Sequence, residues 1–96
     1  MKIIKEAQAG SFESSDLLIL AEPNNEGDGR KIELDSGVYT QYGERILAII
    51  HDILDTYEIT DIHLKINDKG AIEPVIHARM ETVLQRAMGE QQGTLY

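Results

Sequence analysis

Two adjacent serines, Ser14 and Ser15, lie between Glu13 and Asp16 in a segment whose composition is typical of a turn. A serine hydroxyl becomes a catalytic nucleophile when a positioned base removes its proton, and no fixed base is evident near these serines in the sequence. The pattern therefore argues against a hydrolase. It suits a hydroxyl to which another enzyme attaches a group, although by pattern alone an ordinary serine-rich turn explains it more simply.

The histidines and the acidic residues give no metal-binding pattern. His51, His63 and His77 fall on three different predicted elements, without the close pair spacing that metal sites usually show, so we expect them to be exposed. The acidic residues between positions 26 and 35 lack the EF-hand pattern, and a solvated acidic surface explains them. No Walker-type glycine loop or nucleophile elbow is present. A stand-alone enzyme would need a pocket with convergent titratable groups, and the sequence indicates none.

Arg79 falls at the edge of the apolar stripe of a predicted helix. Long cationic side chains commonly lie along apolar surface and extend to water from such an edge. The alternative is that the guanidinium holds a carboxylate, a backbone carbonyl or a phosphate near the sheet. The sequence leaves both interpretations open.

The elements that position these residues begin with strands, which the hydrophobic pattern predicts over residues 2–12, 17–21, 31–35 and 60–67. Ile62, Leu64 and Ile66 are expected to face inward from the last strand. The first two strands and the turn between them predict a β-hairpin whose tip lies near Glu13 to Ser15. Residues 22–30 have loop composition, and residues 67–70 have turn composition.

A helical period predicts one helix over about 38–57 and a second over about 72–88. Ser36 is expected as the N-cap of the first helix, Pro74 is expected to open the second, and Gly89 is expected to end it. The two apolar stripes consist of Tyr39, Tyr42, Ile46, Ile49, Ile50, Ile53, Leu54 and Tyr57, and of Ile72, Val75, Ile76, Met80, Val83, Leu84 and Ala87.

The order β-β-β-α-β-α predicts an α+β two-layer sandwich, with both helices on one face of a sheet of about four strands. We expect a single domain over residues 1–96, in which residues 90–96 form a loose tail.

Composition limits the classes of function. The 96 residues carry 9 basic and 17 acidic side chains, and the net charge of −8 argues against nucleic-acid binding and against anionic membrane surfaces. The absence of cysteine excludes disulfides, thiolate catalysis and cysteine-ligated zinc. No apolar run approaches the ~18–20 residues of a membrane span. We expect a small acidic cytoplasmic domain that binds, carries or regulates.

The segment Ala9-Gly10-Ser11-Phe12-Glu13-Ser14-Ser15-Asp16 resembles the G-[S/T]-x-E-S-x-D signature of the citrate lyase acyl carrier proteins, the γ subunits of citrate lyase. The resemblance covers nearly the whole chain. It includes the apolar strand after the motif, the Pro23 loop, Gln41-Tyr42-Gly43, Asn67-Asp68-Lys69-Gly70-Ala71 and Ala78-Arg79. Two departures are that Ser15 stands where a glycine can occur and that the loop over 22–30 is specific to this chain.

The resemblance implies a non-catalytic carrier. In that family the serine of the E-S-x-D element, which is Ser14 here, carries 2′-(5″-phosphoribosyl)-3′-dephospho-CoA through a phosphodiester. The implied role is to carry acetyl and citryl thioesters between an acyltransferase α subunit and a lyase β subunit while citrate is cleaved to acetate and oxaloacetate. A separate transferase attaches the group, and no nucleic-acid or membrane partner is implied. The carrier of malonate decarboxylase and a small acidic interaction or regulatory module are the alternatives.

Overall fold

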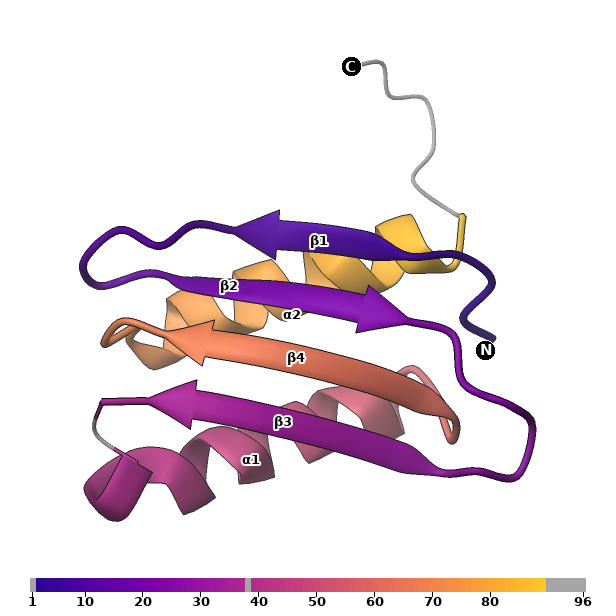
Figure 1. The fold of residues 1–96 in the computed structure, drawn as a ribbon, viewed down its shortest axis with the longest axis horizontal. Helices are drawn as coiled ribbons and strands as arrows, with labels where there is room; N and C mark the ends of the chain where they lie inside the picture. Colours follow the sequence, from indigo (N-terminus) through magenta and orange to yellow (C-terminus); the bar gives the residue numbers. More distant parts are fainter. Residues whose placement is uncertain (1, 38, 90–96) are drawn as a thin grey trace.

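Two helices cover one face of a four-stranded sheet in the computed structural model, which describes residues 2–37 and 39–89 (Figure 1). The strands are β1 (Ala7–Gly10), β2 (Leu17–Glu22), β3 (Arg30–Ser36) and β4 (Ile62–Asp68), and the helices are α1 (Tyr39–Thr56) and α2 (Glu73–Ala87). The predicted order β-β-β-α-β-α and the predicted α+β two-layer sandwich are confirmed.

The sheet has the strand order β1-β2-β4-β3. β1 and β2 form the predicted antiparallel hairpin, in which Ala9 pairs with Ile19 and Gly10 pairs with Leu18. β4 lies between β2 and β3, antiparallel to the first and parallel to the second. Parallel neighbours need a crossover connection, and α1 provides it between β3 and β4.

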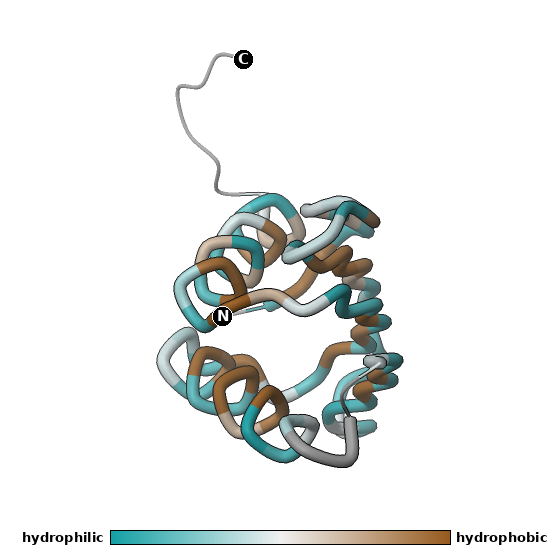
Figure 2. Tube along the Cα trace, turned by 90° about the vertical axis from the view of Figure 1, so that its left-hand side faces the viewer, coloured by the Kyte–Doolittle hydropathy of each residue, from teal (hydrophilic) through white to brown (hydrophobic). Residues whose placement is uncertain are grey.

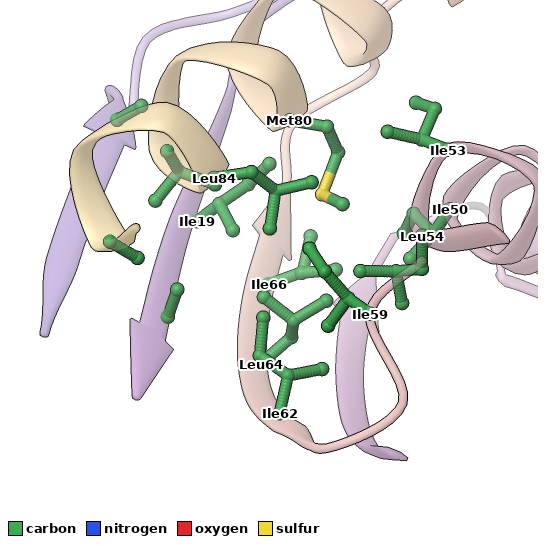
Figure 3. Close-up of a cluster of buried hydrophobic side chains, with 14 of the residues drawn as sticks. Ile19, Ile50, Ile53, Leu54, Ile59, Ile62, Leu64, Ile66, Met80 and Leu84 are labelled. Carbon is green, nitrogen blue, oxygen red and sulfur yellow. The ribbon is translucent and has the colours of Figure 1, made fainter. Parts of the chain in front are cut away.

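The core is the single layer of side chains between the sheet and the two helices. Figure 2 shows the backbone of the sheet and the helices on either side of this layer. Ile62 and Leu64 of β4 are completely buried and Ile66 nearly so, as the alternating pattern predicts. Figure 3 shows side chains from both helices and the sheet pointing into this layer, among them Ile50 of α1 and Met80 of α2. Burying a large aliphatic side chain contributes about 1.5–3 kcal/mol, so this layer supplies most of the drive to fold.

The first predicted strand is too long at both ends. Instead of residues 2–12, β1 contains only four residues. The backbone N–H groups of Ile4 and Lys5 donate to the carbonyl of Ala87 at 3.0 and 3.1 Å, and Ile3 is buried. The segment before β1 therefore contacts the end of α2, which a local pattern of alternating residues cannot reveal.

The start of α1 also differs from the prediction. Ser36, expected as an N-cap, is the last residue of β3, and its hydroxyl donates to the carboxylate of Asp68 at 2.9 Å. Asp68 is buried at the end of β4 rather than in the predicted turn, and it also accepts the N–H of Ala71 at 2.9 Å. Val38, where the helix was predicted to begin, lies outside the described residues, as does the predicted tail over 90–96.

Among the members of the predicted apolar stripes whose burial the structure describes, two are exposed. Tyr42 is 56% exposed and Ile72 is 63% exposed, and both line a groove between α1 and the start of α2. The stripes continue past the region where the helices face the sheet, so periodicity alone overestimates burial there. In α2 the other predictions are confirmed, because Pro74 stands in the first turn and Gly89 follows the C-cap with φ of 72°.

Neither helix in the described part of the chain is long and apolar enough to cross a lipid bilayer.

Candidate functional site

The hairpin tip is a tight turn that rests on the connection between β4 and α2. The backbone N–H of Asp16 donates to the carbonyl of Glu13 at 3.1 Å, which makes Ser14 and Ser15 the two central residues of the turn. The N–H of Ser15 donates to the carbonyl of Lys69, and the N–H of Lys69 donates to the carbonyl of Asp16, both at 2.9 Å. The tip is therefore a fixed structure, as the hairpin prediction placed it.

Ser15 has a φ of 65°, in the left-handed region. The second central residue of a turn with positive φ is usually glycine or asparagine, because a side chain adds strain there. This backbone explains physically why a glycine suits the position, and it marks Ser15 as the residue that fits the turn less well.

Gly10 forms the base of the tip. Its φ is 97°, and a Cβ atom at this position would lie 1.8 Å from the carbonyl oxygen of Leu17. That carbonyl accepts the N–H of Ser11 at 3.2 Å, which leads the chain into the turn. Only glycine permits this close approach of the two strands.

Asp16 is a buried carboxylate with four donors. It accepts the backbone N–H of Leu17 at 2.7 Å, the hydroxyl of Ser11 at 2.7 Å, and Nε and Nη2 of Arg79 at 3.0 and 2.8 Å. The hydrogen bond from Arg79 and then that from Ser11 hold the pKa of Asp16 well below its ordinary range, against the opposing effect of burial. Asp16 is therefore ionised at neutral pH and anchors the tip to α2.

The serines of the tip differ in what their hydroxyls do. The Ser11 hydroxyl donates to Asp16 and accepts the N–H of Glu13 at 3.2 Å, so it belongs to the framework of the turn. Ser14 and Ser15 are exposed, and neither hydroxyl is hydrogen bonded within residues 2–37 and 39–89. The structure thus places Ser14 at the exposed tip, where its hydroxyl is accessible to another protein.

Arg79 holds a carboxylate, which was the second of its two predicted interpretations. Its bidentate bond to Asp16 spans 63 positions of the sequence, and its side chain remains 42% exposed. The periodicity of α2 indicated that Arg79 lies at the edge of the stripe. No sequence signal identified its partner, because only the packing of α2 against the hairpin brings the two residues together.

The histidines lie away from this site. His51 and His77 are exposed, as expected, although His51 Nδ1 lies 3.0 Å from Nη1 of Arg30. His63 is only 20% exposed in its side chain, with Nδ1 3.2 Å from Glu22 and Nε2 2.5 Å from Glu33. This pairing, which sequence reasoning missed, lowers the pKa of Glu33 and follows from the placement of β4 between β2 and β3.

The chemistry available at the tip is limited. Ser14 and Ser15 present exposed hydroxyls, and within the described residues no carboxylate or histidine is hydrogen bonded to Ser14 as a base positioned to deprotonate it. No group of three or more metal-ligating side chains occurs in the described ranges either. The arrangement can accept a covalent group that another protein supplies.

Comparison with known proteins gives consistent matches over almost the full length. The sequence model of an acyl carrier family, described as malonate decarboxylase delta subunit (MdcD), matches residues 4–87. The citrate lyase acyl carrier protein of Vibrio cholerae serotype O1 (strain M66-2) is 43% identical over 95% of this chain and 92% of its own length. The citrate lyase acyl carrier protein of Weissella paramesenteroides is 44% identical over 92% of this chain and 89% of its own length. That of Edwardsiella ictaluri is 39% identical over 91% of this chain and 88% of its own length.

Among solved structures, the fold is similar to a chain in the crystal structure of a Pseudomonas malonate decarboxylase hetero-tetramer in complex with malonate. The TM-score is 0.73, and the match covers 88% of this chain and 86% of that one. With 23% sequence identity, this likeness establishes the shared fold.

Proposed function

The chain belongs to the family of citrate lyase acyl carrier proteins, and from this premise we propose that it is the acyl carrier subunit of a citrate lyase. The observation that carries the proposal is the identity of 39–44% to carriers of that name over about nine tenths of the chain. Family membership makes it a carrier and not a catalyst. Within the described residues no base is hydrogen bonded to the Ser14 hydroxyl, which agrees with that role.

Acyl carrier proteins carry a prosthetic group, and we propose phosphoribosyl-dephospho-CoA attached at Ser14. Three observations support Ser14. Its side chain is exposed, its hydroxyl has no hydrogen-bond partner among the described residues, and the alternative Ser11 hydroxyl is hydrogen bonded to Asp16. Glu13 before it and Asp16 after it complete the E-S-x-D element. The residues at the tip fit such a group, because an exposed turn accepts a large substituent without disturbing the buried layer.

Attachment is a phosphoryl substitution performed by a transferase. The Ser14 Oγ bonds to a phosphorus of a polyphosphate-activated form of the prosthetic group, and the bond from that phosphorus to its phosphate or diphosphate leaving group breaks. The hydroxyl proton passes to a base of the transferase, and the product is a phosphodiester. The carrier contributes an accessible hydroxyl on a turn fixed by Asp16 and Lys69.

When attached, the group supplies the thiol on which acyl groups move between subunits. Tethering raises the effective concentration of the thioester at each partner, because the encounter becomes intramolecular. We propose the acyltransferase α subunit and the lyase β subunit of citrate lyase as these partners, in the cytoplasm. The net charge of −8 would favour docking on basic partner surfaces.

The carrier of malonate decarboxylase is the second candidate. The family description and the similar Pseudomonas structure support it. The higher identity to the citrate lyase carriers, 39–44% against 23%, favours the first candidate.

The test is reconstitution with each set of partners. The chain is modified by a citrate lyase prosthetic-group transferase and combined either with citrate lyase α and β subunits or with the other subunits of malonate decarboxylase. We expect oxaloacetate from citrate in the first mixture and no carbon dioxide from malonate in the second. The opposite result would assign the chain to malonate decarboxylase.

Peptide mass mapping locates the attached group in the same preparation. We expect the added mass on Ser14, absence of that mass from Ser14→Ala, and normal modification of the matched control Ser15→Ala. Persistent modification of Ser14→Ala would disprove the assigned site without affecting the choice between the two complexes.

A further inference from the structure

The link between the hairpin tip and α2, made by Asp16, Arg79 and Ser11, is called the tip clamp below. The Asp16 carboxylate accepts hydrogen bonds from the Arg79 guanidinium and from the Ser11 hydroxyl. The backbone N–H of Asp16 also donates to the carbonyl of Glu13 at 3.1 Å, and the carbonyl of Asp16 accepts the N–H of Lys69 at 2.9 Å. Asp16 therefore links α2 to the hydrogen bonds with Ser11, Glu13 and Lys69 that hold the turn around the attachment serine.

The clamp also sets the charge next to Ser14. The ends of a four-residue turn lie within about 7 Å of each other, which is shorter than the Debye length of about 8 Å at physiological salt. A carboxylate at Asp16 consequently acts on a phosphate that approaches Ser14. Arg79 offsets that negative charge, and its Nη1 atom has no hydrogen-bond partner in the part of the chain that the structure describes.

A second ion pair in the molecule provides a natural comparison. Nε and Nη2 of Arg45 donate to the carboxylate of Glu73 at 2.9 and 3.0 Å, in the same bidentate geometry. This pair joins α1 to the first turn of α2, and its side chains are 60% and 50% exposed. Among residues 2–37 and 39–89, neither Arg45 nor Glu73 forms a hydrogen bond or ion pair with the tip, so this pair serves as a control for the loss of one Arg–carboxylate pair on α2.

We propose that Arg79 is a positioning residue for the covalent modification of Ser14. Through Asp16 it fixes the turn that presents the hydroxyl, and it offsets the negative charge of the buried Asp16 carboxylate beside the incoming anionic donor. This inference rests on the proposed function, because it concerns the transfer of a phosphate-linked group to Ser14.

The first measurement is the initial rate of attachment by the transferase, followed by intact mass at several carrier concentrations. Arg79→Met should lose about tenfold or more in kcat/KM, since small displacements of a reacting group are costly in rate. Arg45→Met should match the wild type. Arg79→Lys, which keeps the charge but not the guanidinium fork, should fall between them.

The second measurement is amide hydrogen exchange on the unmodified protein, which needs no attached group. Arg79→Met should speed exchange at the N–H groups of Ser15 and Asp16, which form the tip contacts, and leave the amides of β4 unchanged. Arg45→Met should change neither set. If Arg79→Met does not fold, Asp16→Asn takes its place, and we expect the same faster exchange at Ser15.

The outcomes separate the two proposals. Normal modification of Arg79→Met, with exchange at Ser15 and Asp16 equal to that of Arg45→Met, would overturn the positioning role and leave the carrier function standing. A wild-type chain that the transferase does not modify would overturn the carrier function and the positioning role with it.

Discussion

The buried layer and the hairpin tip are stabilised in different ways. In the layer, residues such as Ile50, Leu54 and Met80 are completely buried and depend on volume and apolar contact. At the tip, Ser14 and Ser15 are exposed, and the backbone is held by hydrogen bonds and the clamp at Asp16. The two regions meet through the sheet, through α2 and through the connection between β4 and α2. A large substituent can therefore be added at the tip without repacking the layer that keeps the chain folded.

Replacing Ile50 by aspartate should have the largest effect, because it places an unpaired carboxylate in the completely buried layer. The cost should exceed about 4 kcal/mol, which approaches the whole stability of a small domain. We expect a circular dichroism melt without a cooperative transition. Ala48→Asp, on the exposed side of the same helix, should fold normally, and a folded Ile50→Asp variant would show that the layer is not the main source of stability.

Replacing Gly10 by alanine tests the base of the tip, where a Cβ would overlap the Leu17 carbonyl. We expect a loss of about 3 kcal/mol or more, since both the positive φ and the steric overlap oppose the methyl group. Gly27→Ala is the matched control, with φ of 90° and no atom within 4 Å of the added Cβ. It should lose only about 1–2 kcal/mol in urea unfolding. Equal losses would contradict the close-approach argument.

Replacing Asp16 by asparagine removes the charge of the clamp. We expect a loss of about 1–2 kcal/mol near neutral pH, because hydrogen bonds to charged groups are strong while Arg79 remains partly exposed. The folded-state pKa of Asp16 is depressed, so its contribution is present above the ordinary value of 3.8 and is lost as the pH falls below it.

The stability difference between wild type and Asp16→Asn should therefore shrink as urea titrations are repeated from neutral pH toward pH 2. The exposed Asp28→Asn substitution should give a small difference that changes little over the same range. A difference for Asp16→Asn that stays constant down to pH 2 would show that the ionised carboxylate contributes nothing to the fold.

Replacing Ser14 by alanine should have the smallest effect on stability, within about 0.5 kcal/mol, because the side chain is exposed and its hydroxyl has no partner in the described residues. Ser11→Ala should cost more than Ser14→Ala, since it removes a donor from Asp16. Thermal melts of the two variants, run in parallel, show which of them loses more stability. The reverse order would mean that Ser14, not Ser11, helps to hold the turn.

Much of the fold was predictable because the local patterns are strong. The alternation of Ile62, Leu64 and Ile66 gave the central strand, and helical spacing gave both helices to within one or two residues at each end that the structure describes. The predictions that were wrong concern particular residues at the ends of elements. Ser36 is the last residue of a strand, and Ile72, at the start of a helix, is 63% exposed. Burial at such positions depends on neighbours that are distant in the sequence.

The sequence by itself determined the composition limits, the hairpin with Ser14 at its tip, and the periods that form the two layers, because these depend on residues close together in the chain. Only the tertiary structure decided the strand order, the pairing of His63 with Glu22 and Glu33, and the contact of Arg79 with Asp16. The physical reason is that an ion pair needs two groups within about 4 Å. Residues 63 positions apart reach that distance only after the helices have packed on the sheet.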